Sequence, residues 1–83
     1  MTTVSFYTRQ GCPLCDEALV VVAPIVKAMH ASLEIVDIDL DLSLLERYNE
    51  RVPVIEVAGE VLAEGRVEGS RALRKKFARA LRG

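Results

Sequence analysis

The amino-acid sequence predicts an α/β fold, a four-stranded mixed sheet in β-α-β-α-β-β-α order with helices on both faces. Three observations lead to this prediction. The chain has 83 residues, of which 51% are hydrophobic and 28% charged, which suits one folded domain over residues 1–83. Strand-like and helix-like segments alternate along the chain. A tight-turn signal at Gly59 separates two strand-like segments and predicts a hairpin.

The first half of the chain predicts a strand, a long helix and a second strand. Residues 3–8 are rich in β-branched and aromatic side chains, which favour a strand. A helix follows over residues 13–29, because Pro13 suits the first turn of a helix. Pro24 lies inside this helix and lacks an N–H group, so we expect a kink or a break there. Residues 33–39 alternate with period two and predict the second strand.

The second half predicts a short helix, a hairpin and a final helix. Ser43-Leu44-Leu45-Glu46 matches a capping box, so a helix should run from there to about residue 49. Residues 53–57 and 61–64 are the two strands of the hairpin. Ser70 is a suitable N-cap for the last helix. The apolar side chains of that helix share one face: Leu73, Phe77, Ala80 and Leu81.

Composition excludes several classes of protein. The longest apolar run, residues 18–26, contains a proline and is too short to span a bilayer. The first residues lack a basic segment followed by an apolar one, so we expect no secretion signal, no membrane attachment and a cytoplasmic protein. Two cysteines are too few for a disulfide scaffold. We expect a monomer.

Charge is distributed unevenly along the chain. Residues 66–83 contain seven basic side chains and one acidic side chain, whereas residues 1–65 contain four basic and eleven acidic ones. The basic C-terminal helix could bind an acidic partner, but its spacing also fits an ordinary helix with a charged solvent face. An aromatic content of 5% and the absence of tryptophan argue against a nucleic-acid-binding module that stacks bases.

Cys12-Pro13-Leu14-Cys15 is the most informative motif. A Cys-x-x-Cys segment that leaves a strand and opens a helix is typical of a redox site. Free N–H groups and the positive end of the helix dipole stabilise a thiolate at Cys12. Arg9 adds a positive charge nearby. Cys15, one helical turn later, is close enough to attack a mixed disulfide at Cys12.

Two other interpretations of the cysteines stay open. Both could be small buried hydrophobic residues without chemistry. They could also form half of a metal or cluster site. Zinc usually takes four ligands, and His30 is the one remaining soft donor, so a metal site would require a dimer or an external ligand.

With these motifs, the chain resembles the glutaredoxin branch of the thioredoxin-like superfamily, and in particular its short, divergent bacterial members. Arg9 stands where the family pattern has lysine, and Leu14 stands where it has an aromatic residue. The element order matches over nearly the whole chain. The matching segments are Phe6-Tyr7-Thr8-Arg9-Gln10-Gly11-Cys12-Pro13-Leu14-Cys15, Arg51-Val52-Pro53-Val54-Ile55 and Glu68-Gly69-Ser70.

The resemblance implies roles for individual residues. Cys12 would be the nucleophile, Cys15 the resolving thiol and Pro53 a cis proline beside them. In a glutathione complex, Arg9 would contact a carboxylate, Val52 the peptide backbone, and Gly69 with Ser70 the γ-glutamyl end. The implied substrate-binding residues are therefore Arg9, Pro13, Leu14, Val52, Pro53, Gly69 and Ser70. Glu68 and Arg71 depart from the family pattern, which has glycine and acidic residues there.

Two functions follow from these observations. The first is a thiol–disulfide oxidoreductase of the glutaredoxin-like type that reduces protein disulfides or glutathione mixed disulfides. It would need no bound cofactor, and its electrons would come from glutathione, as a co-substrate, or from a reductase. The second is a non-enzymatic module on the same fold that binds a metal, a cluster or an acidic partner.

Overall fold

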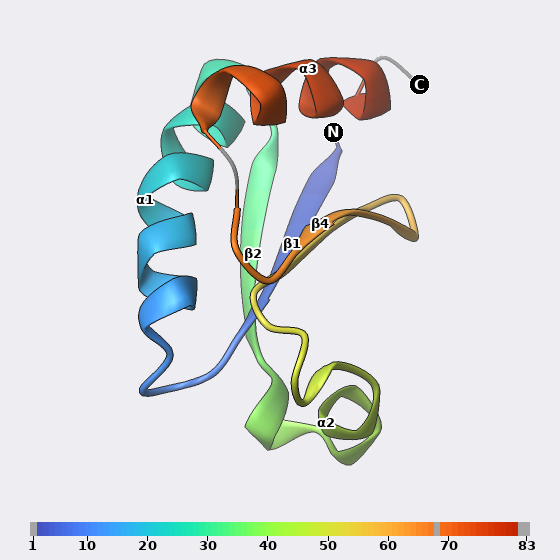
Figure 1. Cartoon of the computed structure of the whole chain (residues 1–83). Coiled ribbons are helices and arrows are strands. Elements are labelled where there is room, and N and C mark those ends of the chain that lie inside the picture. The colour runs from blue at the N-terminus through green and yellow to red at the C-terminus, as the bar shows by residue number, and fades with distance from the viewer. Residues whose placement is uncertain (1, 68, 82–83) are drawn as a thin grey trace.

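The computed structural model describes residues 2–67 and 69–81, so Glu68 lies outside the described residues. The predicted order of strands and α-helices is confirmed (Figure 1). One short 3₁₀ helix, η1, is additional. The elements are β1 (Thr3–Thr8), α1 (Pro13–Ala28), β2 (Ser32–Asp37), η1 (Ile38–Leu40), α2 (Leu42–Tyr48), β3 (Val54–Val57), β4 (Glu60–Glu64) and α3 (Ser70–Leu81).

The four strands form one mixed sheet in the order β2-β1-β3-β4. β1 runs parallel to β2 and antiparallel to β3, and β3 pairs with β4 as the predicted antiparallel hairpin. Val4 lies opposite Leu33 on one side and opposite Val57 on the other. Because β1 is a central strand, the loop that follows it is anchored by neighbours on both sides.

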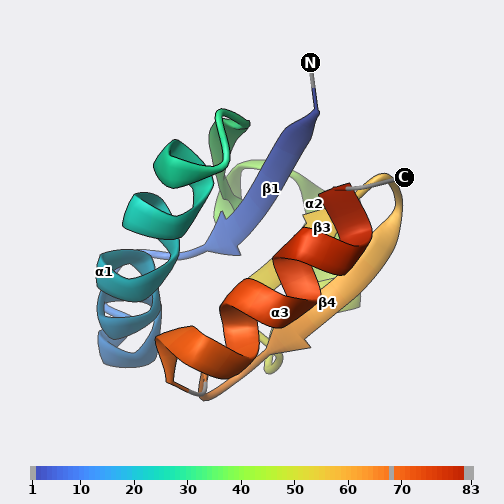
Figure 2. The ribbon, with the colours of Figure 1, turned by 90° about the horizontal axis from the view of Figure 1, so that it is seen from above.

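Helices cover both faces of the sheet, as predicted. The larger core joins one face to α1 and α3, and it is made of Val4, Phe6, Ala18, Val22, Ile25, Val26, Ile55, Val57, Leu73 and Phe77. The smaller core, on the other face beneath α2, is formed by Ile38, Tyr48 and Val54. Figure 2 shows α3 crossing over β3 and β4. Among the described residues, no helix has the length and apolarity needed to cross a membrane.

Helix α1 continues through Pro24, so the expected break in the helix is wrong. Pro24 cannot donate to the carbonyl of Val20, four residues earlier. Both residues lie on the solvent side of α1, and Val20 is 75% exposed, so water can hydrogen-bond to the carbonyl that Pro24 leaves free. Val22 and Val26 on the opposite side are buried in the larger core and hold the helix against the sheet.

The boundaries between β2 and α2 differ from the prediction. β2 ends at Asp37 because that side chain accepts a hydrogen bond from the amide of Asp39 (2.9 Å) and starts η1. The cap of α2 is Asp41 rather than the predicted Ser43. The carboxylate of Asp41 accepts hydrogen bonds from the amides of Ser43 (2.9 Å) and Leu44 (3.2 Å). The capping-box assignment was therefore wrong, because an aspartate two residues earlier satisfies the same amides.

The hairpin and the last helix start close to the predicted positions. Ala58 and Gly59 both have positive φ, 51° and 81°, which is the pattern of a two-residue hairpin turn. Ser70 is the first residue of α3 rather than its N-cap, since the carbonyl of Gly69 accepts the first helical hydrogen bond, from Leu73 (3.3 Å). Gly69 thus occupies the cap position.

Phe77 tests the packing of α3 on the sheet. Its side chain is fully buried in the larger core, so Phe77→Ala should lower the free energy of unfolding by about 3–5 kcal/mol through lost burial and a cavity. Urea denaturation followed by circular dichroism measures this loss. Arg74→Ala, on the exposed side of the same helix, is the matched control and should change it by no more than about 0.5 kcal/mol. A loss below about 1 kcal/mol for Phe77→Ala would show that α3 does not pack as described.

The role of Asp41 as the cap of α2 can be tested by the pH dependence of the stability of the protein. Hydrogen bonds from the hydroxyl of Ser43 and the amide of Leu44 hold the pKa of Asp41 below its ordinary value. A lowered folded-state pKa means that the carboxylate stabilises the fold above the unfolded-state pKa of about 3.9, and that this contribution is lost as pH falls through the folded-state pKa. The urea midpoint of the wild type should exceed that of Asp41→Asn at neutral pH, and the two midpoints should converge as pH falls through the folded-state pKa of Asp41. A difference that is independent of pH would contradict the assignment.

Candidate active site

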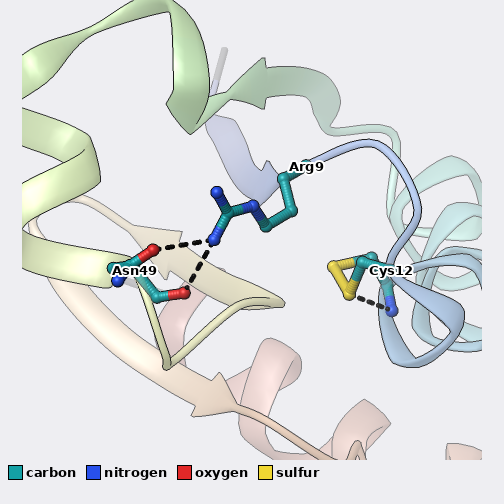
Figure 3. The surroundings of a disulfide bond; sticks show 4 residues. Arg9, Cys12 and Asn49 are labelled. Carbon is teal, nitrogen blue, oxygen red and sulfur yellow. Dashed lines mark hydrogen bonds between the residues drawn. A yellow bond between two sulfur atoms is a disulfide. The ribbon is translucent and has the colours of Figure 1, made fainter.

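The dithiol site, Cys12 and Cys15, lies where the loop after β1 enters α1. Cys12 is the N-cap residue of α1, and its sulfur accepts a hydrogen bond from the amide of Cys15 at 3.1 Å. The carbonyl of Cys12 accepts the first helical hydrogen bond, from Asp16 (3.1 Å). The two cysteines form a disulfide with a Cα–Cα distance of 5.2 Å (Figure 3). Pro13 occupies the first turn, where its missing N–H leaves no helical bond unmade.

The two sulfur-bearing residues differ in exposure. Cys12 is half-buried, whereas Cys15 is 1% exposed and packed beneath the helix start. Pro13 is exposed and Leu14 is half-buried, so both lie at the surface beside Cys12. A reagent or substrate therefore reaches Cys12 first, and Cys15 is placed to react from behind it.

Val52 and Pro53 lie at the same end of the sheet as the dithiol site. Val54 pairs with Tyr7 near the end of β1, so the residues just before β3 stand beside the loop that leads to Cys12. The Val52–Pro53 peptide bond is cis. The carbonyl of Pro53 accepts a hydrogen bond from the amide of Gly65 (2.9 Å). The backbone N–H and C=O of Val52 have no hydrogen-bond partner among residues 2–67 and 69–81.

Arg9 is bound to other parts of the chain. Its guanidinium donates to the carboxylate of Asp39 at 2.7 Å and to the side-chain and main-chain oxygens of Asn49 at 2.8 and 3.2 Å. In Figure 3 the side chain extends toward Asn49 and not toward Cys12. The positive charge that the sequence places near Cys12 is thus balanced by the carboxylate of Asp39. A contact of Arg9 with a glutathione carboxylate stays a prediction.

Gly69 and Ser70, the residues expected at the γ-glutamyl end of glutathione, lie at the start of α3. Both are exposed. Gly69 uses its carbonyl to begin the helix. In the described part of the chain, no hydrogen bond or ion pair links either residue to the dithiol site. Their role in binding stays a prediction.

A cluster that the sequence analysis did not identify holds α2 against the sheet. The hydroxyls of Tyr7 (3.3 Å) and Tyr48 (3.2 Å) both donate to the carboxylate of Glu56, and the two rings lie 4.8 Å apart. Burial and the neighbouring charge of Glu56 raise the pKa of Tyr7. The guanidinium of Arg51 lies 5.2 Å from the ring of Tyr48 and is paired with Glu64, which raises the pKa of Arg51. Sequence spacing gives no signal for these contacts, because the partners come from different elements.

The metal interpretation finds no ligand set in the described residues. Within residues 2–67 and 69–81, no three His, Cys, Asp or Glu side chains gather where they could hold an ion. His30 follows the far end of α1, and 16 residues of helix separate the two ends by about 24 Å. His30 therefore cannot share an ion with Cys12 and Cys15 of the same chain.

The sheet order, the covering helices and the Cys-x-x-Cys pair at the start of α1 define a thioredoxin-like fold with a redox-type site. The chain belongs to the glutaredoxin-like family: the model of the "Glutaredoxin-like domain (DUF836)" matches residues 3–78. No curated protein matches the chain.

Solved structures agree with this family and fold. The X-ray structure of protein XcR50 from X. campestris is 31% identical, with a TM-score of 0.76 over 93% of this chain and 97% of that one. Protein Ne2328 from Nitrosomonas europaea is 28% identical, with a TM-score of 0.70 over 87% and 86% of the two chains. Thioredoxin 1 from Thermosipho africanus, at 15% identity and a TM-score of 0.69 over 96% and 94%, shares the fold.

The difference in exposure between the cysteines is testable by alkylation. With limiting iodoacetamide, the reduced protein should be modified at Cys12 about tenfold faster than at Cys15, because Cys12 is accessible and lies at the helix N-terminus. Fragmentation of the tryptic peptide that holds both cysteines locates the label. In urea the preference should disappear, which serves as the control. Equal labelling of the native protein, or faster labelling of Cys15, would contradict the geometry.

Proposed function

We propose that this protein is a dithiol–disulfide oxidoreductase whose substrates are either protein disulfides or mixed disulfides of proteins with glutathione. The observation that carries the proposal is the arrangement of the dithiol site. The sulfur of Cys12 caps α1 and accepts an amide hydrogen bond, while Cys15 lies buried one turn behind it. An amide that donates to sulfur stabilises the thiolate more than the thiol, so the position favours the nucleophilic form of Cys12.

The reaction proceeds by two thiol–disulfide exchanges. The Cys12 thiolate attacks one sulfur of a substrate disulfide, which forms a mixed disulfide and releases the other substrate sulfur as a thiolate that takes up a proton. Cys15 then loses its proton and attacks the sulfur of Cys12. This step forms the Cys12–Cys15 disulfide and releases the second substrate thiol. Two electrons pass from the dithiol to the substrate, and an external thiol such as glutathione, or a reductase, restores the dithiol.

Substrate binding would use the backbone of Val52. Its free N–H and C=O lie at the end of the sheet that bears the dithiol site, so an extended segment of a substrate could pair with them as an added strand. Leu14, half-buried beside Cys12, offers apolar contact next to the reacting sulfur. No bound cofactor is required, because the electrons are stored in the two sulfur atoms.

Replacement of each cysteine separates the two steps. Cys12→Ser should reduce the dithiothreitol-driven reduction of hydroxyethyl disulfide to the uncatalysed rate, because the attacking sulfur is gone. Cys15→Ser should accumulate a mixed disulfide at Cys12, visible as added mass by intact-protein mass spectrometry. Thermal unfolding of both variants provides the control for folding. Turnover by folded Cys12→Ser equal to that of the wild type would overturn the proposal.

A further inference from the structure

Arg9, in the loop before Cys12, and Arg51, which directly precedes Val52, are each paired with a carboxylate. Within residues 2–67 and 69–81, the ion pairs are Arg9 with Asp39 and Arg51 with Glu64. In the Arg9 pair, one terminal nitrogen of the guanidinium donates to Asp39 and the other donates to Asn49. An incoming anion would have to compete with groups that already occupy both nitrogens.

Two carboxylates stand next to the dithiol site in the sequence. Asp16 and Glu17 follow Cys15 directly in the first turns of α1, and both are exposed. Neither forms an ion pair with a cation in the described part of the chain. Exposed charges that lie farther away than the Debye length, about 8 Å at physiological salt, are largely screened, so the local groups have the larger effect on which substrates approach.

The carboxylate of Asp39 matters most because it is fixed beside Arg9. A substrate carboxylate that binds the guanidinium would come to lie next to Asp39, and two like charges on one arginine repel each other. The Arg9 and Asp39 side chains are 32% and 41% exposed, so solvent weakens the repulsion between Asp39 and a substrate anion. An exposed charge pair of this kind changes a rate or equilibrium constant by up to about fivefold. The backbone groups of Val52, in contrast, would pair with a peptide without regard to its charge, because they have no hydrogen-bond partner within the described residues and carry no net charge.

We propose that Asp39 is a specificity-determining residue that makes the dithiol site select disulfides flanked by neutral or cationic groups, as in polypeptides, over anionic ones such as oxidised glutathione. This inference rests on the oxidoreductase function proposed above. Asp39 acts by its charge on the approaching disulfide, and it takes no part in the exchange of sulfur atoms.

A series of small disulfides of similar size tests the inference. Reduced protein is mixed in single-turnover experiments with cationic cystamine, neutral hydroxyethyl disulfide and anionic dithiodipropionate, and the loss of protein thiol is followed. Asp39→Asn should raise the ratio of the anionic to the cationic rate constant by about fivefold relative to wild type. The comparison of ratios cancels the intrinsic reactivity of each disulfide. The rate constant of Asp39→Asn with the neutral disulfide should stay within about twofold of the wild-type value, because removal of one surface charge has little effect on an uncharged substrate.

Glu60→Gln is the matched control, because it also removes one carboxylate. Glu60 pairs with Val57, which pairs with Val4 at the start of β1, so it lies at the end of the sheet away from the dithiol site. Its ratio should equal that of the wild type. If Asp39→Asn does not fold, the wild type still gives a test. In about 1 M salt the Debye length falls to about 3 Å, so the charges of the protein are screened. The wild-type ratio of the anionic to the cationic rate constant should then be higher than at low salt.

The outcomes separate this inference from the proposed function. A raised ratio in Asp39→Asn, with Glu60→Gln unchanged, supports the role of Asp39. An unchanged ratio in Asp39→Asn, or equal rises in both variants, overturns it while leaving the oxidoreductase activity in place. A wild-type ratio that is insensitive to salt also contradicts it. If wild-type protein reacts with none of the three disulfides, the proposed function itself fails.

Discussion

The first amide N–H groups of a helix have no carbonyl of the same helix to which they can donate. In α1, one of these groups, the amide of Cys15, donates its hydrogen bond to the sulfur of Cys12. The same contact fixes the cap of α1 and favours negative charge on the sulfur. Cys15 is buried by the packing of the helix start. One local arrangement thus provides an accessible nucleophile and a second thiol held behind it.

The rest of the fold keeps this arrangement in place. β1, which leads into Cys12, is held between β2 and β3, and α1 is held by Val22 and Val26 in the larger core. On the other face, Tyr48 joins α2 to the sheet through Glu56. Arg9 then ties the loop before Cys12 to α2 at Asn49, so the charge of that arginine serves the structure as well as the site.

Sequence reasoning reached the element order and the dithiol site, because strand alternation, helix periodicity and the Cys-x-x-Cys spacing are local signals. The expected break at Pro24 was wrong, because the carbonyl that loses its hydrogen bond there is exposed to water and the helix continues. The Ser43 cap was also wrong, because Asp41 accepts hydrogen bonds from the amides at the start of α2. Sequence reasoning also left the partners of Arg9 unpredicted. Those partners lie 30 and 40 residues away along the chain, and the fold alone brings them together.

If the helix start activates Cys12, this thiol ionises before Cys15, and NMR titration of the reduced protein with carbon labels on both cysteine side chains measures the order of ionisation. We expect Cys12 to titrate with an apparent pKa between about 3.5 and 7.5, while Cys15 stays protonated to higher pH. Two cysteines that both titrate near the free-thiol value of about 8.5, or ionisation of Cys15 first, would contradict it.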